Sequence, residues 1–155
     1  DYCGIVYADN LDAPGFVKLA DERTLLLPDR RGNQRLDSLR NIARDPRVAL
    51  LFLVPGAGEA LRVNGTARIS ASAPLCAAFA VDGKAPASVL VVSVTSVFFQ
   101  CARAIQRSQL WNPERHVAPG TLPSAGAMLQ ALTGERFDGR AYDAALPARQ
   151  ADTLY

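Results

Sequence analysis

The sequence predicts a β-rich α+β fold, a barrel of five or six strands with a few small helices added to it. Apolar or alternating segments of strand length recur through the first two thirds of the chain, and short turns join most of them. Helical patterns are few, whereas a doubly wound sheet needs a helix between most of its strands. A length of 155 residues, of which 49% are hydrophobic and 21% charged, indicates one globular domain.

The first predicted strands are two apolar runs, residues 16–19 and 23–28, which a turn-like segment separates. Pro28 ends the second strand. The polar stretch 29–36 contains glycine and asparagine and is predicted to be a loop rich in hydrogen-bond donors. A short helix is predicted over residues 37–44, because its apolar side chains have helical spacing and a proline stands just beyond its end.

The middle of the chain is predicted to contain three more strands and a small helix. Residues 48–54 form a continuous apolar run, which is typical of a strand buried on both faces. Residues 61–69 alternate between apolar and polar and indicate a half-buried strand, in which Asn64–Gly65 is expected to be a bulge or a close approach. A small helix over residues 74–81 precedes a long β-branched and aromatic strand over residues 88–99.

The last third of the chain has a different composition, rich in Pro, Gly and Ala. Before it, residues 100–109 are predicted to turn helical. A further helix is predicted over residues 124–133, and Gly134 would terminate it. The tail after Arg136 is expected to be a docking or solvated segment.

Composition excludes several classes of function. The net charge of +2 is too small for nucleic-acid binding by bulk electrostatics. Three widely spaced cysteines suggest neither a disulfide framework nor a zinc cluster, and favour a reducing, cytoplasmic setting. The single histidine, His116, supports neither a histidine metal site nor a Ser-His-Asp triad. No apolar run has the length of a membrane helix, and no standard phosphate-loop motif occurs.

The chain starts at Asp1 without a methionine, so we expect that a segment precedes it.

The distribution of arginine is the most informative feature. Fifteen of the 17 basic residues are arginine, and six of these fall within eighteen residues. In one interpretation they reflect a genome that favours arginine over lysine and a solvated helix face. In the other, Arg30, Asn33, Arg35, Ser38 and the amides of the first helical turn converge on a phosphate, because a guanidinium group offers two parallel donors.

Four segments in a fixed order carry a resemblance to a known family: RTLLLPDRRGNQRLDSLRNI, DPRVALLFLVPG, LRVNGTARI and VFFQCARAIQRSQLW. They resemble the pyridoxamine 5'-phosphate oxidase-like flavoproteins, and most closely a largely uncharacterised bacterial subgroup that depends on FMN. The resemblance implies a six-stranded antiparallel FMN-binding split barrel with small peripheral helices. It also implies a homodimer with one FMN in each of two clefts between the subunits. We therefore expect one split-barrel domain over residues 1–155, with a core at 13–113 and a C-terminal extension at 114–155.

The resemblance also implies which residues contact the cofactor. The ring would be lined by Thr24, Leu25, Leu26 and Leu27. Ribityl and phosphate would be surrounded by Asp29, Arg30, Asn33, Arg35 and Ser38. From the other subunit, Arg103 and Arg107 would reach the flavin, and Trp111 would either cover the ring or fill the core or the dimer interface. No catalytic side chain and no metal ligand is identified.

Two departures from the family pattern argue against oxidation of pyridoxamine phosphate itself. Pro28 stands where the oxidase proper has a lysine at the end of the strand. Residues 8–11 read Ala-Asp-Asn-Leu, where the closer subgroup has a Ser-Pro-Arg-Gly stretch. Either Arg31 or Arg35 compensates for the lost arginine, or the affinity for FMN falls.

The remaining arginines of the cluster are assigned to the surface. Arg40, Arg44 and Arg47 are expected to form a solvated or ion-paired face with Asp37 and Asp45, because spacings of three and four residues suit such pairs.

Two hypotheses about function follow from the resemblance. The chain is an FMN-dependent oxidoreductase that acts on an unidentified small molecule, with FMN supplying the redox chemistry. Alternatively, it is a split-barrel dimer without catalytic activity that binds or senses a flavin or a haem-type ligand.

Overall fold

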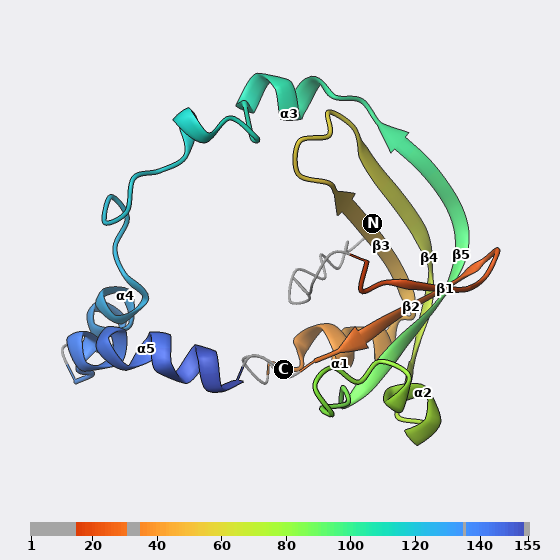
Figure 1. The fold of residues 1–155 in the computed structure, drawn as a ribbon, viewed down its shortest axis with the longest axis horizontal. Helices are drawn as coiled ribbons and strands as arrows, with labels where there is room; N and C mark the ends of the chain where they lie inside the picture. The colour runs from red at the N-terminus through yellow and green to blue at the C-terminus, as the bar shows by residue number, and fades with distance from the viewer. Residues whose placement is uncertain (1–14, 31–34, 135, 154–155) are drawn as a thin grey trace. The chain divides into compact units, whose positions relative to one another are not determined.

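The computed structural model describes residues 15–30, 35–134 and 136–153, which form two compact units (Figure 1). The first unit, residues 15–108, contains the β-sheet and three small helices. The second unit, residues 109–153, is helical. None of the described helices is both long enough and apolar enough to span a membrane.

The sheet of the first unit is antiparallel and has the strand order β1-β2-β5-β4-β3. Its strands are β1 (Lys18–Asp21), β2 (Thr24–Asp29), β3 (Arg47–Leu53), β4 (Ala60–Ser70) and β5 (Ser88–Gln100). The prediction of an antiparallel sheet with small helices is confirmed. The prediction of six strands is wrong for the described part of the chain, which has five strands; residues 1–14, ahead of β1, lie outside it.

Strand β5 organises the sheet because it is long enough to pair with two neighbours. Its first half pairs with β2, from Ser88 opposite Asp29 to Ser93 opposite Thr24. Its other edge pairs with β4 along the whole strand, as far as Gln100 opposite Ala60. β5 has 13 residues, so its two ends are up to about 40 Å apart at about 3.3 Å per residue.

The expected bulge at Asn64–Gly65 is confirmed. The register between β4 and β5 shifts there, with Asn64 opposite Ser96 and Gly65 opposite Val94. The Thr95 hydroxyl donates to the backbone oxygen of Asn64 at 3.0 Å. A Cβ at Gly65 would lie 2.2 Å from the backbone oxygen of Ser93, so only glycine fits in this buried position without a shift of the neighbouring strand.

The prediction that the strand at residues 48–54 is buried on both faces is wrong. β3 is an edge strand of the sheet. Val48 is buried in the core, whereas Leu51 and Leu53, on the opposite face, are 47% and 43% exposed. A continuous apolar run fits a central strand as well as an edge strand with one uncovered apolar face, and only the strand order distinguishes the two.

Helix α1 (Asp37–Arg44) and helix α2 (Ala73–Ala77) each pack beside a buried cluster. Ile42 of α1 belongs to the larger cluster, with Leu27, Leu90 and Val92 among its members. Cys76 of α2 belongs to the smaller one, together with Phe79 and Val89. α1 has the predicted bounds, because its spacing and its proline stop are local signals.

Two predicted helices are shorter in the structure. α2 ends at Ala77, before a tight turn in which Asp82 (φ 49°) and Gly83 (φ 76°) both have left-handed backbone. α3 (Arg103–Ser108) begins late because β5 continues to Gln100. In each case, residues at one end of the predicted helix belong to a neighbouring turn or strand instead.

The second unit is built around two helices, α4 (Ala125–Leu132) and α5 (Gly139–Thr153), preceded by a short 3-10 helix, η1 (Pro113–Arg115). α4 lies where it was predicted, and the Ser124 hydroxyl caps it by accepting from the Ala127 amide at 3.1 Å.

The tail, expected only as a docking or solvated segment, is the 15-residue helix α5. Its Asp143 carboxylate accepts from the Gly126 amide of α4 at 2.8 Å. Pro147 inside the helix, and apolar residues that do not follow helical spacing, hid it from the sequence pattern.

Candidate functional site

The end of β2 is held firmly to the start of β5. The backbone oxygen of Asp29 accepts from the Ala87 amide at 3.1 Å, and the buried Ser88 hydroxyl donates to Asp29 Oδ2 at 3.0 Å. Arg30, half-buried, follows directly. The chain therefore leaves the sheet toward α1 from a fixed point.

The N-terminus of α1 offers backbone donors. Leu36 precedes the helix and makes no side-chain cap, and the first intrahelical bond runs from the Arg40 amide to the Leu36 oxygen at 2.8 Å. Ser38, half-buried, lies in the first turn. The first amides of a helix have no partner within the helix, and the helix dipole favours negative charge beside them. This end of α1 can therefore bind an anion.

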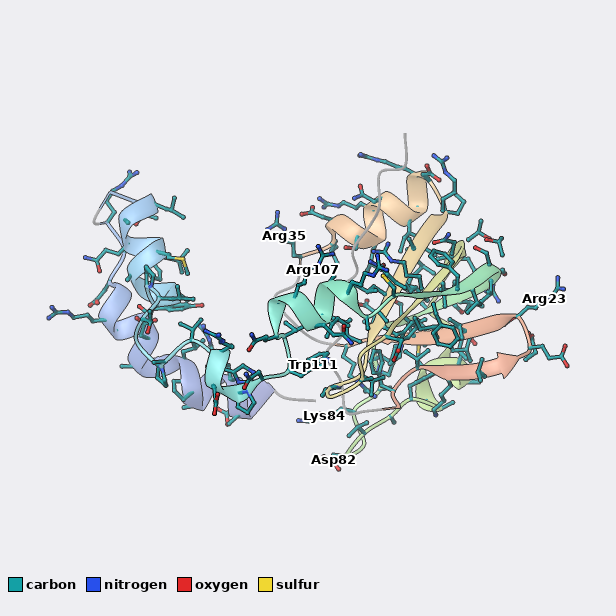
Figure 2. The ribbon with its side chains drawn as sticks, turned by 90° about the horizontal axis from the view of Figure 1, so that it is seen from above. Arg23, Arg35, Asp82, Lys84, Arg107 and Trp111 are labelled. Atoms are coloured by element: carbon teal, nitrogen blue, oxygen red, sulfur yellow. The ribbon has the colours of Figure 1, made fainter. Side chains whose placement is uncertain are left out.

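Arg35, labelled in Figure 2, stands just ahead of this helix turn. Its side chain pairs with Asp37. Arg35 Nε lies 2.6 Å from Asp37 Oδ2, and the two side chains are 74% and 57% exposed. The hydrogen bond and the charge of Arg35, with a further contribution from the charge of Arg40, lower the pKa of Asp37. An incoming anion would therefore share Arg35 with Asp37 or draw it away.

The residues predicted to line the ring are part of the sheet. Leu25 and Leu27 are buried in the larger core cluster, and Leu26 packs against the smaller one. Thr24 is paired with Ser93 of β5. Residues 24–26 pair with both β1 and β5, whereas beyond Leu26 the described partner of β2 is β5 alone.

Four of the residues predicted to surround phosphate and ribityl lie at the end of β2, at the start of α1 or directly next to these ends: Asp29, Arg30, Arg35 and Ser38. Asn33 lies outside the described residues. Arg103 and Arg107 are exposed on α3, which follows the far end of β5 (Figure 1). The length of β5 puts them up to about 40 Å from Asp29 within one chain. Trp111, half-buried, belongs to the second unit.

Sequence reasoning missed an apolar surface around the far ends of β3, β4 and β5. Val97 is 57% exposed and Phe99 78% exposed, next to Phe98 at 46%. The half-buried Arg62 donates a hydrogen bond to Gln100 in the same region. Val97 and Phe99 share one face of the sheet and Phe98 lies on the other. Exposed apolar residues of this size mark interaction surfaces. The adjacent Phe98 and Phe99, which must face opposite sides of one strand, were the available signal.

Metal-ligating side chains do not cluster in the described part of the chain: no three His, Cys, Asp or Glu side chains there are placed to hold a common ion.

The later arginines of the cluster lie on the surface, and Arg47 is ion-paired as predicted. Arg47 Nε donates to Asp45 Oδ1 at 2.9 Å. Arg40 is close enough to Asp37 to contribute to its lowered pKa, and Arg44 is exposed. Hydrogen bonds from Arg47 lower the pKa of Asp45 to about 2.

This pKa predicts a pH-dependent contribution of Asp45 to stability. The carboxyl is more acidic in the folded state than in an unfolded chain, where its pKa is about 3.9. Its stabilising effect is therefore present above about pH 4 and is lost as the pH falls toward 2. We expect Asp45→Asn to lower the urea midpoint slightly at about pH 6 and to lower it less as the pH falls from about 4 to about 2. A difference of the same size at about pH 6 and at about pH 2 would contradict the assignment.

Comparison with known proteins gives one family and a group of solved structures. The sequence profile described as pyridoxamine 5'-phosphate oxidase matches residues 6–101. Two crystal structures of HupZ from Group A Streptococcus are similar to the chain. A single-residue variant is 18% identical with a TM-score of 0.46, over 55% of this chain and 73% of that one. The other is 19% identical with a TM-score of 0.44, over 54% and 68%. No curated protein matches.

Proposed function

Because the chain belongs to the pyridoxamine 5'-phosphate oxidase family, we propose that it is an FMN-dependent oxidoreductase that acts on an unidentified small molecule. The observation that carries the proposal is the junction between β2 and α1. There Arg30, Arg35 and Ser38 lie along one short stretch of chain that ends in a helix N-terminus without a side-chain cap. This donor set fits a phosphate dianion.

The phosphate would be held mainly by charge and by backbone amides. Arg35 would turn part of its guanidinium group from Asp37 to the phosphate, while the first amides of α1 and the Ser38 hydroxyl donate to it. Asp29 has only acceptor oxygens when ionised, so it suits the ribityl hydroxyl groups better than the phosphate. The Ser88 hydroxyl fixes its carboxylate for that purpose.

The ring would lie along the last residues of β2. Leu25 and Leu27 point into the core, so contact with the ring would be made by the backbone. Residues 27–29 are better placed for this than residues 24–26, which pair with a strand on each side. When bound, FMN supplies the transfer of a hydride or of electrons, and the protein supplies position and electrostatics.

A second copy of the chain would complete each site. Within one chain, α3 follows the end of β5 opposite to the end that pairs with Asp29, with up to about 40 Å of strand between them, so Arg103 and Arg107 are proposed to act on the site of the other subunit. The exposed Val97 and Phe99 suit burial between two copies. In such a homodimer, α3 of one subunit would bring positive charge beside the ring held by the other. Positive charge there stabilises negative charge on the reduced cofactor.

The decisive measurement is the visible spectrum of the purified protein, followed by titration with FMN and reduction with NADH and NADPH in air. We expect flavin absorption bands, or quenching of free FMN fluorescence at a ratio of one FMN per chain. A protein that stays colourless and leaves FMN fluorescence unchanged would rule out the proposed cofactor. Tight FMN binding without reduction by either donor, or binding of haemin in place of FMN, would favour the alternative of a binding or sensing dimer.

A further inference from the structure

We infer that Gln109 is a positioning residue that fixes the orientation of Trp111, the only tryptophan in the chain. Both residues belong to the second unit, on the segment that follows α3 (Figure 2). The positioning itself is independent of any ligand. Its consequence for a flavin rests on the proposed function and on the interpretation, from the sequence analysis, in which Trp111 covers the ring.

Gln109, two residues before Trp111, makes hydrogen bonds to residues that follow Trp111 in the sequence. Its backbone has φ 50°, the left-handed region that residues other than glycine seldom occupy. Its backbone oxygen accepts from the Asn112 amide at 2.8 Å. Its side-chain oxygen Oε1 accepts from Asn112 Nδ2 at 3.0 Å and from Arg115 Nε at 3.2 Å. One side chain therefore ties together the turn that contains Trp111.

Asn112 extends this arrangement into the 3-10 helix η1. Its Oδ1 accepts from the Glu114 amide at 3.0 Å and caps the helix, and its backbone oxygen accepts from the Arg115 amide at 3.0 Å. The residues that hydrogen-bond to Gln109 are thus themselves held by η1. Trp111 lies inside this closed set of hydrogen bonds, and its backbone has little freedom.

A non-glycine residue in the left-handed region is strained unless its surroundings hold it there. Here the hydrogen bonds of Oε1 offset the strain, which explains why a glutamine stands at a position that glycine would occupy more easily. An aromatic side chain carried on a backbone that is already fixed has less conformational freedom to lose when a ligand stacks on it. The structure therefore assigns Gln109 the task of preparing Trp111 for stacking.

Tryptophan fluorescence tests the inference directly, because Trp111 is the sole emitter of its kind. We would measure the anisotropy decay and the acrylamide quenching of Trp111 in the full-length protein without ligand. Gln109→Ala is expected to increase the amplitude of nanosecond ring motion about twofold. Gln109→Glu keeps an oxygen acceptor for Arg115 and should restore most of the rigidity.

Gln106→Ala, an exposed glutamine on α3, is the matched control and should leave the decay unchanged. If Gln109→Ala leaves it unchanged, or if Gln106→Ala has an equal effect, the inference is wrong. Should Gln109→Ala unfold the second unit by circular dichroism, Asn112→Asp replaces it. That variant keeps the Oδ1 cap of η1 and removes the Nδ2 donor, and an unchanged Trp111 decay in it would also overturn the inference.

The effect of Gln109→Ala on FMN binding is measured in a separate experiment. If the proposed function holds, Gln109→Ala should also weaken FMN binding, by less than the loss of a phosphate contact. Greater mobility of Trp111 with unchanged FMN affinity would support the positioning role and remove Trp111 from the flavin site. If the wild-type protein binds no FMN, the proposed function fails and the fluorescence result still decides the role of Gln109.

Discussion

Replacing Arg35 with alanine is expected to raise the Kd for FMN about tenfold to a hundredfold, whereas Arg44→Ala changes it less than about twofold. A hydrogen bond to a charged group contributes about 1.5–3 kcal/mol. Arg35 stands at the uncapped start of α1, where the phosphate is proposed to bind. Arg44, in the last turn of the same helix, is a matched arginine at the other end. Quenching of FMN fluorescence measures both constants.

Asp37→Asn is a control that is expected to change the Kd for FMN in the opposite direction from Arg35→Ala. It removes the negative charge that now engages Arg35 at 2.6 Å, so it should tighten FMN binding. Equal effects of Arg35→Ala and Arg44→Ala would show that only overall charge matters, and would remove Arg35 from the phosphate site. Loosened binding in Asp37→Asn would indicate that the ion pair itself forms part of the site.

Arg35→Ala also tests whether two chains share each FMN site. Mixed dimers of an Arg35→Ala chain and an Arg103→Ala chain contain one intact site and one site that lacks both arginines. We expect such mixtures to regain tight FMN binding at up to about half of the sites of the wild-type dimer. Mixtures that bind FMN no better than either variant alone would contradict a site shared between two chains.

Gly65→Ala is expected to destabilise the first unit by about 3 kcal/mol or more, or to prevent its folding. The new Cβ would meet the backbone oxygen of Ser93 at 2.2 Å. A backbone atom in the centre of a sheet cannot move aside as a flexible side chain can, so β4 and β5 would have to separate. The expected fall in Tm is more than about 10 °C, measured by circular dichroism in the strand region.

Gly58→Ala is the matched control. A Cβ there would lie 3.4 Å from the Ala102 Cβ, an ordinary contact, so its Tm should stay close to that of the wild type. A Gly65→Ala protein as stable as Gly58→Ala would mean that β4 and β5 are farther apart at the bulge than the structure places them.

Local patterns predicted α1 well because its signals lie within a few residues. The phosphate candidates stay a prediction. Arg30, Arg35 and Ser38 are neighbours in the chain, so their proximity needed no knowledge of the fold. The bond between Ser88 and Asp29 joins residues 59 positions apart, and strand order alone reveals it. Leu51 and Leu53 are exposed in β3, which is an edge strand of the sheet. The seven-residue apolar pattern of β3 does not reveal its place in the strand order.

The sequence also did not predict which elements lie at the same end of the sheet. The resemblance implies that α3 acts on the other subunit, whereas the position of α3 at the end of β5 away from Asp29 comes from the pairing of β5 with both β2 and β4. α5 was missed as a helix because Pro147, a residue that usually ends a helix, lies inside it. Its contact with α4 includes glycines and Asp143, which leave no apolar stripe in the sequence.

The bulge between β4 and β5 also determines which residues of β5 face each side of the sheet. Val94 is opposite Gly65 and Val97 is opposite Val63, so both lie on the same face although their numbers differ by three. Even-numbered residues of β5 face the larger core before the bulge, and odd-numbered residues share that face after it. Phe99 owes its side of the sheet to this single extra residue. Loss or gain of one residue at this point would exchange the two faces of the exposed apolar surface while leaving every side chain in it unchanged.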